Sequence, residues 1–82
     1  MDAKERWVIV EFWDSVAIED WADIEEAQLM KPELCSIFGK VAREEEEFIT
    51  VICCKGGKQI THTWCVPKCT TTMIEEVIFT ES

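Results

Sequence analysis

The chain is poor in basic residues and has a single histidine. It contains eight lysines and arginines against seventeen aspartates and glutamates, which gives a formal charge of −9. Such a charge repels the phosphate backbone of nucleic acids and anionic membrane surfaces. We therefore expect neither a nucleic acid nor a membrane as a partner. The acidity either attracts a basic partner or only keeps the protein soluble.

Long apolar runs are also missing. No stretch approaches the roughly 20 apolar residues of a membrane span, and the first residues, MDAKER, lack the apolar segment of a signal peptide. Five cysteines are present, but an odd number with Cys53 next to Cys54 does not suit a disulfide scaffold. We expect reduced thiols and a cytoplasmic location.

Apolar residues are plentiful despite the short chain. Of the 82 residues, 48% are hydrophobic, and four are tryptophan and four phenylalanine. A chain of this length forms one domain, residues 1–82. Its apolar content suffices for a core and leaves some side chains for an interface.

The first predicted element is a strand over residues 6–14, RWVIVEFWD. Its β-branched and aromatic residues favour a strand over a helix. Val8, Val10 and Phe12 fall on one side, which we expect to face the core. The other side carries Trp7, Ile9, Glu11 and Trp13, which indicates a second, partly covered surface.

A helix is predicted next, ending at Met30 and starting between Ser15 and Asp20. Apolar residues recur there at helical spacing, including Ile18, Trp21 and Leu29. Asp20 and Asp23 place negative charge near the N-terminus of this helix, and Pro32 stops it.

Four further strands are predicted, over residues 33–43, 48–54, 59–66 and 71–79. Glu44–Glu47 forms one turn and Lys55–Lys58 a Gly-Gly hairpin, while Gly39 marks a bulge or a sharp bend. Five short antiparallel strands bury one face of their sheet by closing into a barrel. The expected fold is mostly β (α+β): a five-stranded antiparallel small barrel with one helix inserted after the first strand.

Several segments carry a resemblance to known proteins. The last strands, with their acidic turn, glycine turn and Val66-Pro67-Lys68 segment, resemble SH3-like and Sm-like small barrels, in which a one-turn 3₁₀ segment joins the last two strands. The chain is also similar to small proteins of tailed phages and prophages, through WVIVEFWDS, DWADIEEA, CSIFGKVAREEEEFITV and VPKCTTTMIEEV. Sm rings bind RNA through basic and aromatic loop positions, whereas the corresponding turn here, Glu44–Glu47, is acidic.

The cysteines and the histidine raise the questions of zinc binding and of catalysis. Cys65 and Cys69 have a loose ligand spacing, but Cys65 and His62 fall on opposite sides of one strand, so both cannot easily ligate one ion. A thiolate nucleophile needs a base and an orienting group, and no catalytic-cysteine signature surrounds any thiol. We expect buried free thiols, no metal, no cofactor and no enzymatic activity.

Two sets of residues are candidate binding sites. Backbone N–H groups and ammonium groups at the glycine turn favour an anion; the alternative is an ordinary hairpin turn whose charges prevent edge aggregation. This set is Lys55, Gly56, Gly57 and Lys58, with Lys68 expected at the same end of the fold. The second set is the interface candidates Trp7, Trp13, Trp21 and Trp64.

We expect the side of the first strand that carries Trp7 and Trp13 to be covered by another part of the protein or by a second subunit. Either the helix over residues 20–30 covers it with Trp21 and Leu29, or a second subunit does. We therefore predict a non-enzymatic, self-associating binding module. The phage resemblance implies an accessory protein that binds and inhibits a host component, or that sequesters a small anionic signalling molecule. A structural virion or assembly component is the alternative.

Overall fold

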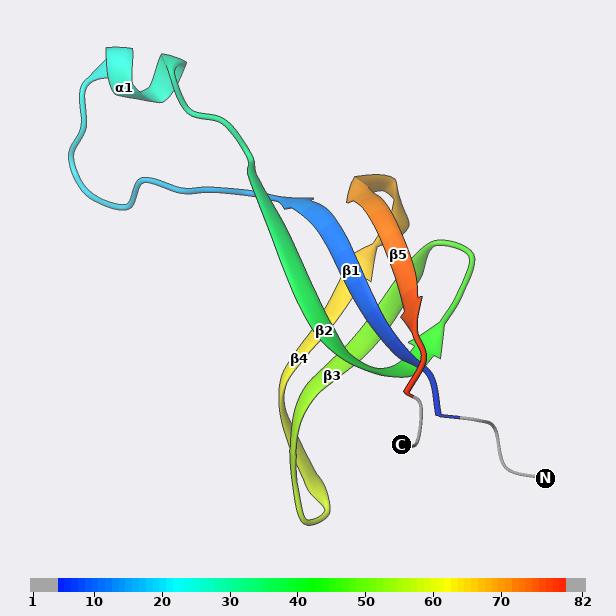
Figure 1. Ribbon diagram of the computed structural model, residues 1–82. Coiled ribbons are helices and arrows are strands. Elements are labelled where there is room, and N and C mark those ends of the chain that lie inside the picture. Colours follow the sequence, from blue (N-terminus) through cyan, green and yellow to red (C-terminus); the bar gives the residue numbers. More distant parts are fainter. Residues whose placement is uncertain (1–4, 80–82) are drawn as a thin grey trace.

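The computed structural model describes residues 5–79 and shows a mostly-β protein with one short helix (Figure 1). All strand pairs are antiparallel, and the order β4-β3-β2-β1-β5 makes one open sheet. The predicted five strands are confirmed. The elements are β1 (Trp7–Asp14), α1 (Ile24–Gln28), β2 (Glu33–Glu44), β3 (Phe48–Gly56), β4 (Gln59–Pro67), the 3₁₀ turn η1 (Lys68–Thr70) and β5 (Thr71–Val77).

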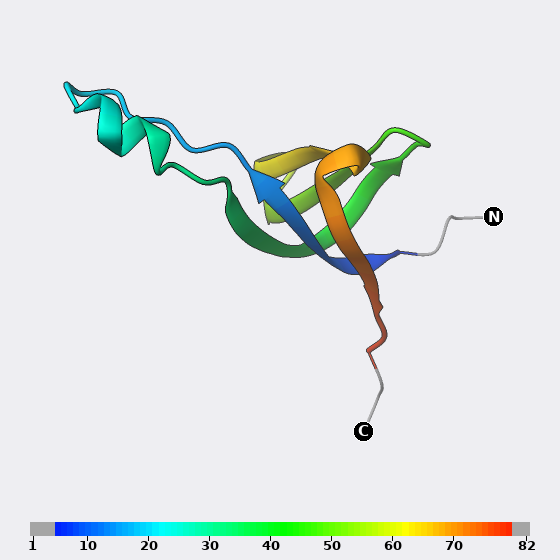
Figure 2. The ribbon, with the colours of Figure 1, turned by 90° about the horizontal axis from the view of Figure 1, so that it is seen from above.

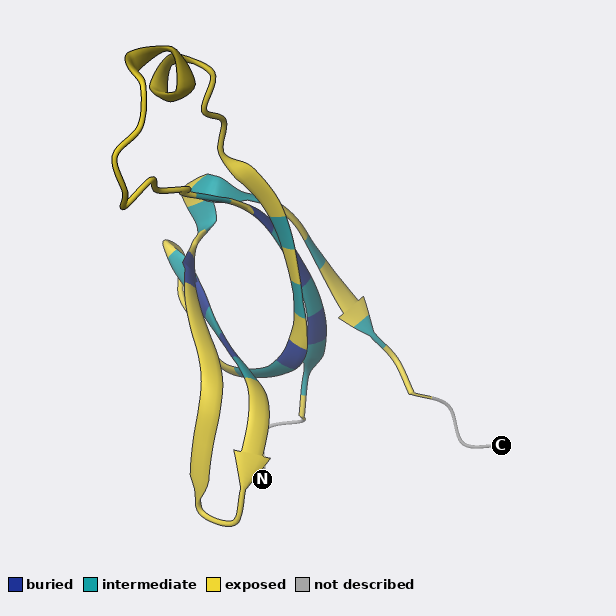
Figure 3. Cartoon of the chain, turned by 90° about the vertical axis from the view of Figure 1, so that its left-hand side faces the viewer, coloured by how far each residue is buried: buried dark blue, intermediate teal, exposed yellow. Residues whose placement is uncertain are grey.

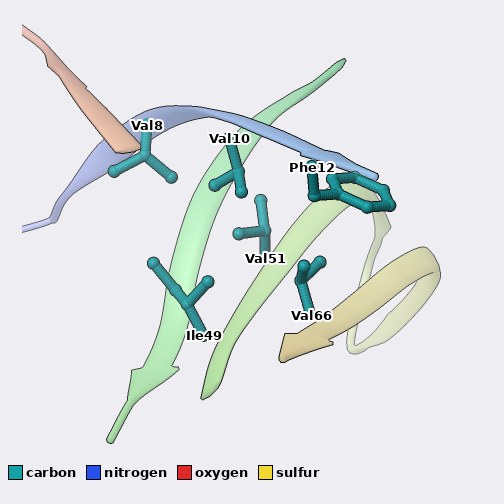
Figure 4. Packing of buried hydrophobic residues seen from close by; sticks show 6 residues of the cluster. All are labelled: Val8, Val10, Phe12, Ile49, Val51 and Val66. Carbon is teal, nitrogen blue, oxygen red and sulfur yellow. The ribbon is translucent and has the colours of Figure 1, made fainter. Parts of the chain in front are cut away.

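The sheet curls around its own inner face, which carries the core (Figure 3). Side chains from β1, β3 and β4 point toward one another there (Figure 4). As predicted, Val8, Val10 and Phe12 face this core. The buried side chains are Val8, Val10, Phe12, Ile49, Val51 and Val66, and Cys35, Ile37, Val41 and Ile74 pack against them while partly exposed.

Gly39 allows β2 to approach β3 closely. A Cβ atom at this position would lie 2.4 Å from the carbonyl oxygen of Ile52 and 2.8 Å from Cγ1 of Val51. The register between β2 and β3 shifts nearby, between Val41 and Arg43. The irregularity therefore lies beyond Gly39 rather than at it, and Gly39 itself provides the room for the close approach of the two strands.

The edges of the sheet are β4 and β5, joined by η1. The Lys68 N–H donates to the carbonyl of Glu47 at 2.8 Å, and the hydroxyls of Thr70 and Thr71 donate to the Pro67 carbonyl at 3.1 and 3.0 Å. A one-turn 3₁₀ segment thus joins the last two strands, as the resemblance to small barrels implies.

The predicted helix is wrong in extent. The sequence predicts that it starts between Ser15 and Asp20 and ends at Met30. Only Ile24–Gln28 is helical, and it begins where the carbonyl of Asp23 accepts the N–H groups of Glu26 and Ala27. A helix shorter than about 12–15 residues needs a packing partner, and every residue from 15 to 32 is exposed. We call residues 15–32 the arm; it projects away from the sheet (Figures 1 and 2).

The strand ends differ slightly from the prediction. β3 continues to Gly56, so the hairpin loop is Gly57–Lys58, and β5 ends at Val77 rather than residue 79. Gly57 has φ 61°, as the first residue of a tight two-residue hairpin loop requires. Within residues 5–79, no helix has the length and the apolar content needed to cross a membrane.

Candidate binding site

Apolar side chains line the outer face of the sheet, opposite the core. The antiparallel register places Ile9 beside Phe38 and Trp13 beside Leu34. The Trp7 ring stacks on Phe38 with centroids 5.8 Å apart, and it meets the edge of Phe79 at 5.7 Å. About half of Trp13, Leu34 and Phe38 is exposed. We call this surface the outer strip: Trp7, Ile9, Trp13, Leu34, Phe38 and Phe79.

A groove adjoins the outer strip where β1, β2 and the β3–β4 hairpin meet. Its volume is about 380 Å³, within the range of small-ligand sites. Trp7, Ile52 and Ile60 supply apolar walls, and Lys40 and Lys55 supply two ammonium groups; we call these five residues the lysine groove. Glu5, Cys53 and Cys54 complete its lining.

The charges of the lysine groove interact with one another. The Lys40 Nζ donates to Glu5 Oε1 at 2.8 Å. This hydrogen bond and the charge of Lys40, with a smaller contribution from the charge of Lys55, lower the pKa of Glu5. Both lysines therefore act on one carboxylate, and after Glu5 is counted the groove keeps one positive charge in a strongly acidic protein.

The predicted anion site is only partly brought together. Lys55, Gly56, Gly57 and Lys58 lie at the tip of the β3–β4 hairpin. Lys68 follows the opposite end of this ladder, where Phe48 pairs with Pro67; eight residue steps of about 3.3 Å place it roughly 26 Å away. Its Nζ instead lies 2.6 Å from Glu44.

Lys40, rather than Lys68, is the lysine that shares a pocket with Lys55. Sequence reasoning did not find it, because Lys40 and Lys55 lie on different strands and come together only through the β2–β3 register. That register places Lys40 opposite Ile52. The alternation of apolar residues along each strand predicts faces but not which residues of two strands are paired.

The four tryptophans lie in three different places. Trp7 and Trp13 belong to the outer strip, and Trp64 lies on the inner side with its ring 5.9 Å from that of Phe12. Trp21 is fully exposed on the arm, and Leu29 is 78% exposed. The hypothesis that this segment covers Trp7 and Trp13 is therefore wrong, whereas cover by a second subunit stays a prediction.

The arm combines apolar and acidic side chains. An open hollow of about 720 Å³ lies within its curve, lined partly by Ile18, Trp21 and Met30. Nothing in residues 5–79 fills this hollow. The exposed large apolar residues of the arm are Val16, Ile18, Trp21, Ile24, Leu29 and Met30, and its acidic residues are Glu19, Asp20, Asp23, Glu25 and Glu26.

The cysteines and His62 do not gather into a candidate metal site within residues 5–79. All five cysteines are free, and four of them are exposed rather than buried as predicted. No group of three or more potential ligands lies together in this part of the chain. Desolvation of the Cys53 thiol raises its pKa, and the charge of the nearby Cys54 raises it further. An activated thiolate needs a lowered pKa instead. His62 has a left-handed backbone, with φ 52°.

An ion-pair network fastens the end of the sheet remote from the hairpin tip. Glu44 accepts hydrogen bonds from Lys68 and from Arg6, each at 2.6 Å, and these bonds lower its pKa. Arg6 also holds Glu76 through two nitrogens, which lowers the pKa of Glu76. The network links β2, η1 and β5 to Arg6, the residue that precedes β1.

Comparison with protein-family models, with curated proteins and with solved structures finds no match to this chain.

Proposed function

We propose that the chain is a non-enzymatic binding module with an SH3-like barrel that binds acidic, apolar protein segments. The observation that carries this proposal is the lysine groove, in which Lys40 and Lys55 flank Trp7 beside the exposed aromatic residues of the outer strip. The strand order β4-β3-β2-β1-β5 and the 3₁₀ turn between β4 and β5 support the SH3-like assignment.

The chemistry of this surface suits a protein segment. Exposed aromatic and aliphatic side chains in a continuous patch mark interaction sites, and tryptophan is prominent among the residues that dominate binding energy. Two lysines at the edge of such a patch select carboxylates and reject basic segments. A ligand with aspartate or glutamate beside large apolar side chains therefore matches both features.

The resemblance to phage and prophage proteins supports a host protein as the partner that is bound and inhibited. A virion or assembly protein is the alternative partner. The raised pKa of Cys53 supports a non-enzymatic role, because the thiol stays protonated and is a poor nucleophile.

Sequestration of a small anionic molecule is a second candidate function. The volume of about 380 Å³ and the combination of Trp7 with two lysines suit a planar anion such as a nucleotide. Co-purification of material absorbing near 260 nm, and its loss from the double variant Lys40→Glu, Lys55→Glu, supports this function. Purified protein free of such material, with no response to added nucleotides in calorimetry, contradicts it.

A displayed library of random peptides tests the main proposal. We expect the wild-type protein to select peptides that contain Asp or Glu beside Trp, Leu or Ile. The double variant Lys40→Glu, Lys55→Glu should bind them at least about tenfold more weakly, since two ion pairs of about 0.5–1 kcal/mol each are replaced by repulsion.

Lys58→Glu is the matched control, because Lys58 lies in the same hairpin but does not line the groove. It should leave peptide affinity within about twofold of wild type, apart from the screened long-range effect of charge. Failure to select any peptide, or selection of peptides without acidic residues, refutes the proposal.

A further inference from the structure

We infer that the segment bound by the lysine groove and the outer strip is the arm of a second copy of this chain, so that two copies form a symmetric dimer by exchanging arms. This inference rests on the proposed function and names the partner. Because each chain carries both the arm and the surface that receives it, one two-fold axis satisfies both chains.

The first argument is that the arm lacks cover in the single chain. Trp21 is fully exposed, and Ile24 and Leu29 are each 78% exposed. Short helices are not stable in water without a packed apolar face. The helix Ile24–Gln28 therefore needs an apolar surface to pack against, and the outer strip is a surface of this kind.

Charge complementarity is the second argument. The arm carries five acidic residues against one lysine, Lys31, whereas the groove presents Lys40 and Lys55 beside Trp7. Glu25 and Glu26 belong to the helix and follow Trp21 closely in sequence. An arm that places Trp21 and Ile24 on the outer strip thus brings carboxylates close to the lysines.

The direction of the arm is the third argument. It leaves the sheet at the pair Asp14–Glu33, whereas the groove adjoins the pair Trp7–Lys40 at the other end of the same ladder. Seven steps of about 3.3 Å separate these pairs by roughly 23 Å. The arm points away from its own sheet (Figure 2), so it reaches its own groove only by reversing direction, whereas an antiparallel second copy needs no such reversal.

The area available matches that of a stable dimer. The arm offers Ile18, Trp21, Ile24 and Leu29, and the outer strip offers Trp13, Leu34, Phe38 and Phe79. At roughly 100 Å² for each of these side chains, two arms and two strips bury about 1,600 Å², the size of a standard specific interface.

Charge reversal with complementation tests the inference, with mass measured by light scattering and sedimentation over a concentration series. We expect wild type to be a dimer. The groove variant Lys40→Glu, Lys55→Glu and the arm variant Glu25→Lys, Glu26→Lys should each dissociate at least about tenfold more readily. Mixed in equal amounts, they should form a heterodimer, because the native arm then meets the native groove and the reversed arm meets the reversed groove.

Control variants reverse one charge of the same sign at a residue outside the proposed contacts. Lys58→Glu and Glu46→Lys should remain dimers, and circular dichroism of every variant should match that of wild type. A variant with all four groove and arm reversals in one chain should dimerise again. Trp21→Ala provides an uncharged test and should weaken the dimer.

Monomeric wild type at all concentrations overturns the inference, as does a dimer that neither reversal weakens or a mixture that fails to associate. The proposed function is tested separately by an isolated peptide of residues 15–32. If library peptides bind the groove but the protein stays monomeric, the inference fails and the function stands. If neither library peptides nor the arm peptide binds Trp21→Ala at a concentration where this variant is a monomer, both fail.

Discussion

Replacing Gly39 with alanine gives the sharpest test of the sheet geometry. The added Cβ would lie 2.4 Å from the Ile52 carbonyl oxygen and 2.8 Å from Cγ1 of Val51. Neither neighbour can move freely, because Ile52 belongs to the β2–β3 ladder and Val51 is fully buried. The clash therefore has to separate β2 from β3 where they enclose the core.

The change in the free energy of unfolding caused by Gly39→Ala follows from two opposing effects. Overpacking in a core destabilises by about 1–3 kcal/mol, and removing a glycine from the unfolded chain returns about 0.4–1 kcal/mol. The two together give an expected loss of about 1–2 kcal/mol in the free energy of unfolding for Gly39→Ala. For a domain of this size, this loss is a large part of a total of roughly 4–12 kcal/mol, and it lowers Tm by about 10 °C.

The other two glycines of the chain provide matched controls. No atom lies within 4 Å of a Cβ built on Gly56, so Gly56→Ala should be neutral or stabilise by about 0.4–1 kcal/mol. Gly57 has equal space but φ 61°, so Gly57→Ala should cost about 1–2 kcal/mol through backbone strain alone. Urea denaturation under reducing conditions, followed by tryptophan fluorescence, measures all three. If Gly39→Ala is no less stable than Gly56→Ala, the close packing of β2 on β3 is refuted.

Two further predictions concern the ion-pair network and the core. Glu44→Gln should lower the free energy of unfolding at pH 7 by about 1–2 kcal/mol, with the exposed Glu46→Gln as a neutral control. The folded-state pKa values of Glu44 and Glu76 are lowered, so their contribution to the free energy of unfolding is complete above the ordinary carboxyl pKa and is lost as pH falls through the lowered values. In urea titrations, the free energy of unfolding should therefore decrease less between pH 7 and pH 3 for Glu44→Gln than for Glu46→Gln. Equal decreases contradict the role of the network. Val51→Ala, at a fully buried position, should lower the free energy of unfolding by about 2 kcal/mol. Val16→Ala on the arm should change it by less than about 0.5 kcal/mol. Equal decreases in Tm for the two variants would place the core elsewhere.

Much of the strand structure could be predicted because it follows from local patterns. Alternation along β1 identified Val8, Val10 and Phe12 as core residues, and the acidic and glycine turns marked the ends of β3. These features depend on residues close together in the sequence, where strand period and turn chemistry act directly.

The arm and the lysine groove could not be predicted in this way. Helical spacing near Trp21 predicts a helix only if a surface covers its apolar face, and the single chain provides none. Lys40 reaches the groove through the register that places it opposite Ile52, and its spacing along the chain gives no sign of this. Lys68 was assigned to the wrong end of the hairpin because the sequence does not show that its ammonium group pairs with Glu44.

Arm exchange would also set the conditions under which another partner binds. If the arm of a second copy occupies the groove, an external acidic segment gains access only in the fraction of molecules whose groove is free, so its apparent Kd rises as that fraction falls. Dissociation of the dimer on dilution should then increase the apparent affinity for a library peptide. Trp21→Ala should increase this affinity at concentrations where wild type is a dimer, and should leave it unchanged below the dimer dissociation constant, where the groove is already free. Fluorescence anisotropy of a labelled peptide, measured at protein concentrations below and above the dimer dissociation constant, distinguishes this competition. A peptide affinity that is the same in both regimes and in Trp21→Ala would show that the arm and the external ligand do not share the groove.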